Sequence, residues 1–167
     1  MKVNWFRDWE RPVNFEYFTQ DGQIQVNQLI GTKIFGGCSR SNALRSFSLI
    51  SREDYGKKGI EYPFFEGKDV SEFKSLVLRN SGHDVVASML RDGFMQTVIK
   101  NRMDIDAQAF QPVIVFLNGE YWGIHNLREK LNEHYAQVSE HFGYQVPPSE
   151  ADVNSLGYAF MQMNKPA

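Results

Sequence analysis

A short apolar run followed by an Asn-Gly pair constrains the fold of this chain more than any other feature. Residues 112–117 (Pro-Val-Ile-Val-Phe-Leu) are apolar at successive positions, which is typical of a central strand covered on both faces. Asn118-Gly119 follows and is the strongest short signal for a hairpin turn. Residues 120–124 (Glu-Tyr-Trp-Gly-Ile) supply the returning strand. The sequence therefore predicts a β-hairpin here.

Alternating apolar and polar residues predict an antiparallel meander in the first part of the chain. Val13, Phe15 and Tyr17 fall on one face of a half-buried strand, and the hairpin signal Asp21-Gly22 follows. The loop-rich segment 51–75 contains the bulky apolar residues 62–65, which we expect to pack onto the sheet. The predicted strands cover residues 12–19, 23–36 (as one strand or two), 45–51 and 75–79.

One internal helix is predicted over residues 84–103. Gly93 lies inside this segment at a cost of about 1 kcal/mol relative to alanine, and such a glycine is typical of close packing against a neighbour. The apolar stripe that indicates the helix recurs every four residues, at Val86, Leu90, Phe94 and Val98.

Two further helices are expected near the C-terminus. Residues 128–141 are helical in composition, and Ser149 caps a last helix that runs to about Met163. The predicted fold class is therefore α+β: a mainly antiparallel sheet with one packed internal helix, followed by C-terminal helices.

The composition is that of a soluble globular protein and excludes several classes. The chain has 167 residues, 42% hydrophobic and 23% charged, and its abundant aromatic residues can build a real core. A balance of 18 Lys+Arg against 20 Asp+Glu predicts no nucleic-acid partner. No apolar run approaches the length of a membrane span, and Met1–Trp5 contains no signal-peptide core. The single cysteine, Cys38, excludes an intrachain disulfide.

A glycine-rich segment after the second predicted strand is the first candidate site. Gly36 and Gly37 let backbone N–H groups turn toward an anion, and Ser39 and Arg40 can add side-chain donors. The segment is not a Walker loop, and a plain turn is the alternative. Arg45 and Arg79 lie at predicted strand ends, where an arginine either binds phosphate or serves as a solvated edge charge. Both alternatives stay open on the pattern alone.

Two further charged pairs deserve weighing, Arg91-Asp92 in the predicted helix and Arg128-Glu129 after the hairpin. By default Arg91-Asp92 is a surface pair worth ~0–1 kcal/mol, and Arg128-Glu129 belongs to a run of charged residues that opens a helix. The four histidines show no zinc-like spacing, and no nucleophile-elbow motif occurs. We therefore assign no catalytic and no metal-binding residue from the pattern.

Several blocks, in order along residues 5–135, resemble the opening of the CotH-type (spore coat protein H-like) atypical kinases. This resemblance implies a kinase N-lobe-like sheet that uses ATP with Mg2+, and a Ser-rich protein substrate. The blocks are residues 9–13 (Trp-Glu-Arg-Pro-Val), 36–40 (Gly-Gly-Cys-Ser-Arg), 45–47 (Arg-Ser-Phe), 73–80 (Phe-Lys-Ser-Leu-Val-Leu-Arg-Asn), 91–92 (Arg-Asp) and 112–130.

By the same resemblance, the site residues named above lie near the nucleotide. The residues implied for nucleotide binding are Gly36, Gly37, Ser39, Arg40, Arg45, Arg79, Arg91, Asp92, Arg128 and Glu129. Phosphoryl transfer also needs carboxylates that hold Mg2+ and orient the hydroxyl. Relatives carry these in later Asp-rich segments, which this sequence does not contain. We therefore expect nucleotide binding by this chain to be weak or absent, and the chain to be inactive alone.

The last segment resembles something else. Residues 134–163 are similar to the helical tail of some bacterial esterases, which predicts a kinase-like part at 1–135 and a helical tail at 136–167. Two alternatives to a nucleotide-binding lobe are weighed: a non-catalytic interaction module built on Trp5, Trp9 and Trp122, and an esterase-related fragment. An incomplete lobe exposes apolar surface, which predicts self-association or docking of the tail helix. The compartment and the substrate stay open.

Overall fold

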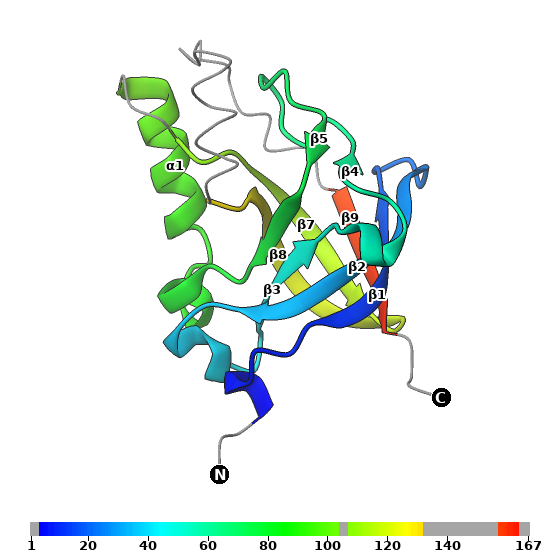
Figure 1. Ribbon diagram of the computed structural model, residues 1–167. Helices are drawn as coiled ribbons and strands as arrows, with labels where there is room; N and C mark the ends of the chain where they lie inside the picture. Colours follow the sequence, from blue (N-terminus) through cyan, green and yellow to red (C-terminus); the bar gives the residue numbers. More distant parts are fainter. Residues whose placement is uncertain (1–3, 104–106, 132–156, 164–167) are drawn as a thin grey trace.

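A barrel of seven strands forms the body of the described chain (Figure 1). The computed structural model describes residues 4–103, 107–131 and 157–163. The strands follow the order β1-β2-β3-β6-β8-β7-β9 around the barrel, and every neighbouring pair is antiparallel except β7 with β9. The barrel strands are β1 (Arg11–Phe18), β2 (Ile24–Phe35), β3 (Ser46–Ile50), β6 (Ser75–Arg79), β7 (Phe110–Leu117), β8 (Glu120–Glu129) and β9 (Gly157–Met163).

Shorter elements connect the strands of the barrel, and one α-helix lies beside it (Figure 1). This α+β arrangement, dominated by antiparallel sheet, confirms the predicted fold class. Within the described residues, no helix combines the length and apolarity that crossing a membrane requires. The remaining elements are the 3-10 helices η1 (Asn4–Phe6), η2 (Cys38–Ser41), η3 (Glu53–Tyr55) and η4 (Gly82–Val86), the small strands β4 (Ile60–Glu61) and β5 (Glu72–Phe73), and the helix α1 (Arg91–Arg102).

The predicted hairpin and meander are both confirmed. Asn118 and Gly119 have φ values of 53° and 82°, so both central residues adopt the positive φ that a tight two-residue turn between β7 and β8 requires. The strands β1, β2, β3 and β6 pair consecutively and antiparallel. Residues 23–36 form one long strand, not two.

The core follows from the period of two along each strand. Inward positions carry aliphatic and aromatic side chains, and burying each one contributes roughly 1.5–3 kcal/mol. The predicted packing of residues 62–65 onto the sheet is confirmed, because Phe64 and Phe65 are buried in the core cluster and the Phe64 ring lies 4.9 Å from that of Tyr17 in β1. The fully buried side chains of the barrel include Val13, Phe15, Ile30, Leu49, Leu76, Leu78, Val113, Val115 and Leu127.

The internal helix is shorter than predicted. α1 begins at Arg91, and η4 precedes it as a separate turn. The buried carboxylate of Asp84 explains the break, because it accepts hydrogen bonds from the Ser88 hydroxyl at 2.6 Å and from the Arg91 backbone N–H at 3.1 Å. An acceptor of this kind satisfies free N–H groups where a helix starts. The predicted close packing at Gly93 is confirmed, since an added Cβ there would lie 3.0 Å from the Phe110 ring.

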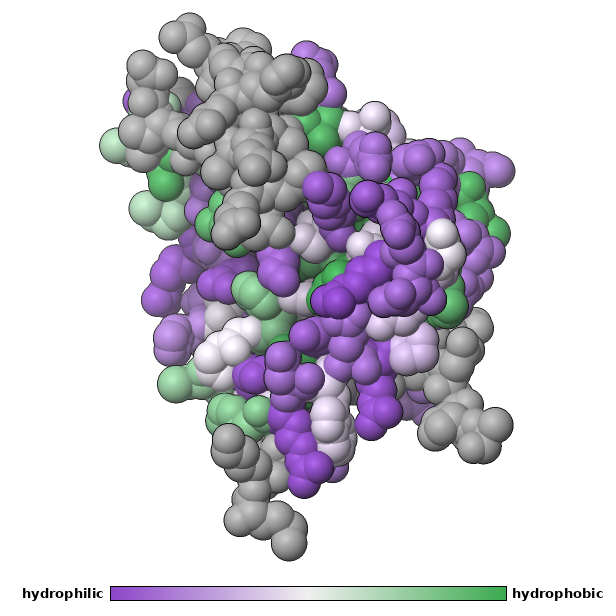
Figure 2. Space-filling model, in the orientation of Figure 1, coloured by the Kyte–Doolittle hydropathy of each residue, from purple (hydrophilic) through white to green (hydrophobic). Residues whose placement is uncertain are grey.

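The predicted apolar stripe does not face the barrel. Val86, Leu90 and Phe94 are 91%, 71% and 64% exposed. The reason is that the break before α1 divides the stripe between two elements with different axes, so a continuous spacing of four no longer defines one face. Figure 2 shows hydrophobic residues on the α1 side of a face that is otherwise mainly hydrophilic.

Two of the helix predictions after the hairpin are wrong where they can be compared. Arg128 and Glu129 belong to strand β8, which pairs with both β6 and β7. Residues Gly157–Met163 form β9, which lies between the free edges of β1 and β7. Two open strand edges supply backbone partners that override helical composition, and Tyr and Phe favour strands. Residues 132–156, with the rest of the predicted helices, lie outside the described residues, and the boundary at residue 135 stays a prediction.

Candidate functional site

An in-register row of side chains crosses the outer face of four neighbouring strands. Lys33 of β2 pairs with Ser48 of β3, Ser48 with Val77 of β6, and Val77 with Arg128 of β8. Their sequence neighbours, such as Leu49 and Leu127, point into the core. Because successive strand residues alternate between faces, this pairing places positive charges from distant parts of the sequence on one outer surface.

This outer surface contains an open cleft of about 790 Å³. Its lining carries six basic side chains and one acidic one, although the whole chain has a net charge of -2. Glu10, outside the lining, pairs with Lys33 and Arg52, so part of this positive charge is compensated. Clustered charge of one sign concentrates ligands of the opposite sign. The basic residues of the lining are Lys33, Arg40, Arg52, Lys74, Arg79 and Lys130, and the acid is Asp8.

The glycine segment forms one rim of the cleft. Gly36 has a φ of 113°, and a Cβ there would collide with the Ser39 hydroxyl, so glycine is required at this position. The Arg40 guanidinium Nη2 donates to the Ile34 carbonyl at 2.8 Å, and the Arg40 carbonyl accepts from Arg45 Nε at 3.1 Å. These bonds tie the loop to the end of β2 and to the start of β3. Gly36, Gly37 and Arg40 all line the cleft.

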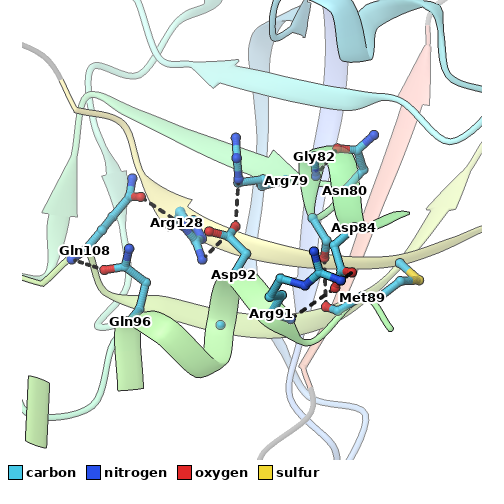
Figure 3. A network of polar contacts seen from close by, with 12 residues as sticks. Arg79, Asn80, Gly82, Asp84, Met89, Arg91, Asp92, Gln96, Gln108 and Arg128 are labelled. Carbon is cyan, nitrogen blue, oxygen red and sulfur yellow. Dashed lines mark hydrogen bonds and ion pairs between the residues drawn. The ribbon is translucent and has the colours of Figure 1, made fainter. Parts of the chain in front are cut away.

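A single carboxylate holds two arginines at the other rim (Figure 3). Asp92, in the first turn of α1, accepts a hydrogen bond from Arg79 Nε at 2.7 Å and lies 3.0 Å from Arg128 Nη2. The second contact is an ion pair whose N–H is not aligned as a hydrogen bond. Arg79 also lines the cleft, with its Nε anchored by Asp92.

Arg128 is the most enclosed charge of this group. Its side chain is 3% exposed, Nη1 donates to Gln108 Oε1 at 3.0 Å, and the guanidinium lies 5.6 Å from the centre of the Phe110 ring. Burial lowers the pKa of Arg128, while the charge of Asp92 raises it. Asp92 therefore compensates a buried cation as well as orienting an exposed one.

Buried polar contacts fix the end of β6 from which Arg79 projects. The Ser46 hydroxyl donates to Asn80 Oδ1 at 2.8 Å, and Asn80 Oδ1 also accepts from the Gly82 N–H at 3.0 Å. Asn80 is 1% exposed, so these bonds are shielded from water. Figure 3 shows Asn80 and Gly82 beside Arg79.

The structure brings together part of the set of site residues predicted from the sequence. Four of them line the cleft: Gly36, Gly37, Arg40 and Arg79. Asp92 is connected to the cleft by its ion pair with Arg79, and Arg128 by its ion pair with Asp92.

Four predicted residues lie elsewhere. Ser39 is outside the lining, and Arg45 stacks on the Trp5 ring at another pocket. Arg91 is exposed and lies 3.4 Å from Asp84. Glu129 is an inward neighbour of Arg128 and forms a buried ion pair with Lys68 at 2.6 Å.

Four basic residues that line the cleft were not predicted from the sequence as site residues: Lys33, Arg52, Lys74 and Lys130. Lys74 and Lys130 fall inside the blocks that carry the resemblance, which is a signal that could have singled them out. Lys33 and Arg52 lie outside these blocks and carry no such signal.

The carboxylates near the cleft do not fit a divalent-metal site. Asp92 is held by two arginines, Glu129 by Lys68, and Asp8 lies 3.4 Å from Lys33. Among the described residues, no group of three His, Cys, Asp or Glu side chains is arranged to hold a metal ion. The carboxylates of the described residues therefore offer no fit for Mg2+, and we derive no step through it.

Comparison with known families identifies the family of this chain. The family model described as CotH kinase protein matches residues 32–152, which is 121 of the 167 residues. The matched segment contains the glycine rim, both arginines held by Asp92, and strands β3 to β8. A search of curated proteins finds no match. The chain belongs to the CotH kinase protein family.

Proposed function

We propose that this chain is the nucleotide-binding portion of a CotH-type protein kinase, with the phosphates of ATP held in the cationic cleft. The observation that supports this proposal most is the lining of six basic side chains and one acidic one. A polyphosphate needs several positive charges and N–H donors, and both are gathered on one surface.

Each part of the lining has a distinct task in this proposal. Arg79 offers a planar guanidinium that can bind two phosphate oxygens at once, and Asp92 orients it. Lys33 and Lys74 act as point charges along the polyphosphate. Gly36 and Gly37 allow the backbone to approach an anion closely.

Phosphoryl transfer works by positioning and by neutralising charge. The cleft supplies both for a nucleotide, whereas its carboxylates are already paired with cations. The proposal therefore assigns nucleotide binding to this chain and assigns no transfer of phosphate to a serine-containing substrate by this chain alone.

Titration with ATP in the presence of EDTA, followed by calorimetry, tests the proposal. We expect saturable binding, because the described contacts need no metal. Arg79→Gln or Lys74→Gln should weaken it about tenfold, since a hydrogen bond to a charged group is worth ~1.5–3 kcal/mol. Lys57→Gln is the matched control, because Lys57 is exposed, pairs with Glu61 and lies outside the cleft. Absence of saturable binding at millimolar ATP would refute the proposal.

A second measurement tests the catalytic part separately. Incubation with labelled ATP, Mg2+ and a Ser-rich peptide should give no incorporation of label. Turnover by this chain alone would show that carboxylates outside the described residues, or a rearrangement of Asp92, complete the site.

A further inference from the structure

The three tryptophans of the chain gather at one end of the barrel. Trp5, Trp9 and Trp122 all line a pocket of about 390 Å³, which lies between the N-terminal segment and the barrel strands. The barrel residues of its lining include Thr32, Ile34 and Phe47, which continue the inward rows of β2 and β3. The pocket is therefore the mouth of the barrel, a common place for ligand sites.

Strand alternation also brings two arginines to this mouth. Arg11 has the same parity as the buried Val13 and Phe15, and Arg45 has the same parity as the buried Phe47 and Leu49. Each arginine thus stands one inward position beyond the core, where the barrel opens. Both line the pocket.

Residues 7–11 cover the mouth, and their basic and acidic side chains also alternate between two sides. Arg7, Trp9 and Arg11 line the pocket. Asp8 and Glu10 alternate with them and instead contact Lys33, at 3.4 Å and 3.6 Å. Among the described residues, no carboxylate lies within ion-pair distance of Arg7, Arg11 or Arg45. The pocket therefore carries three uncompensated positive charges.

The three arginines Arg7, Arg11 and Arg45 each lie over a tryptophan ring. The guanidinium carbons of Arg7 and Arg11 lie 4.8 Å and 4.9 Å from the centre of the Trp9 ring, and that of Arg45 lies 5.3 Å from the Trp5 ring. A guanidinium stacked by its face can still use its N–H groups to bind a carboxylate or a phosphate. In Arg45 these are the terminal N–H groups, because its Nε donates to the Arg40 carbonyl at 3.1 Å.

We propose that the barrel mouth binds an aromatic anion, a planar ring that bears a phosphate, sulphate or carboxylate group. The indole walls favour the ring, and the three arginines favour the charged group. A volume of about 390 Å³ suits a single ring with its substituent and is at the small end of ligand pockets. The wall of β2 separates this site from the cationic cleft, and only Lys33 and Ile34 contribute to both linings. The proposal does not depend on nucleotide binding.

Intrinsic fluorescence tests the proposal directly, because every tryptophan of the chain lines this pocket. The probe is phenyl phosphate, compared with phenol, which lacks the charge, and inorganic phosphate, which lacks the ring. We expect a saturable fluorescence change with phenyl phosphate at concentrations about tenfold or more below those that either comparison compound needs. If inorganic phosphate acts at the same concentrations as phenyl phosphate, the proposed recognition of the ring is wrong. If phenol does so, the proposed recognition of the charged group is wrong.

Paired variants assign the response to the mouth. Arg11→Gln should weaken phenyl phosphate binding about tenfold, since it removes one charged donor. Arg11 is exposed, so the variant should keep its melting temperature and its ATP binding. Arg79→Gln in the cleft should leave the fluorescence titration unchanged. Loss of the response in Arg79→Gln, or its full retention in Arg11→Gln, would refute the assignment.

Discussion

The substitution Asp92→Asn tests the central electrostatic feature of the cleft. Asp92 compensates Arg79 and Arg128 together, and the Arg128 side chain is 3% exposed. Removing one partner of a fully buried ion pair costs about 3–5 kcal/mol, because an unpaired charge stays buried. Asp92 and Arg79 are 21% and 36% exposed, so water compensates part of the loss. We expect the free energy of unfolding to fall by about 2–3 kcal/mol.

Urea unfolding and calorimetry provide the assay. For a chain of this size, 1 kcal/mol shifts the melting temperature by roughly 2–4 °C, so the expected decrease is about 4–12 °C. Glu61→Gln is the matched control, because Glu61 belongs to an exposed pair with Lys57 at 2.9 Å. That pair should contribute at most about 0.5 kcal/mol.

A double variant separates the lost charge from lost packing. Arg128→Met combined with Asp92→Asn removes the buried cation together with its counter-ion, which is often close to neutral for a buried pair. The double variant should therefore be more stable than the sum of the single losses predicts, by about 1 kcal/mol or more. A loss below about 1 kcal/mol for Asp92→Asn, or strict additivity in the cycle, would refute the reasoning.

Three other outcomes are expected. Burial holds the pKa of His125 in the folded chain below 6.5. As the pH falls through this range, the unfolded chain therefore binds more protons than the folded chain. The urea midpoint should fall as pH drops below 6.5, and less so in His125→Gln. Burial raises the pKa of Tyr17 to about 12, so stability should fall above pH 10, and less steeply in Tyr17→Phe. Leu90 and Phe94 are exposed, so we expect the chain to self-associate. The double variant Leu90→Ser with Phe94→Ser should weaken this association in sedimentation experiments. A monomeric parent chain would contradict the prediction.

Local signals predicted the strands well. The turn at Asn118-Gly119 depends on the φ preferences of two adjacent residues, and the first strand on alternation within one segment. Interactions of this range can be inferred without knowing the fold. The start of α1 could not be predicted in the same way, because Asp84 caps a backbone N–H seven residues later, across an irregular turn.

The cleft lies beyond what a single sequence can reveal. Lys33, Lys74 and Lys130 are far apart along the chain, and only the pairing of β2, β3, β6 and β8 places them together. A shift of one residue in that register would turn Lys33 into the core. The glycine rim and Arg79 could be singled out because they lie in the blocks that resemble the family.

The same alternation along β2 places the proposed nucleotide cleft and the proposed barrel-mouth site on opposite faces of one strand. Along β2, Lys33 faces outward and Thr32 and Ile34 face inward, and the two pockets share only Lys33 and Ile34 in their linings. Two sites on opposite sides of one strand should bind their anions independently. We therefore expect the affinity for phenyl phosphate, measured by tryptophan fluorescence, to be the same in the absence of ATP and at saturating ATP. Competition between the two ligands would mean that a single site binds both, and the division of the surface into two sites would be wrong.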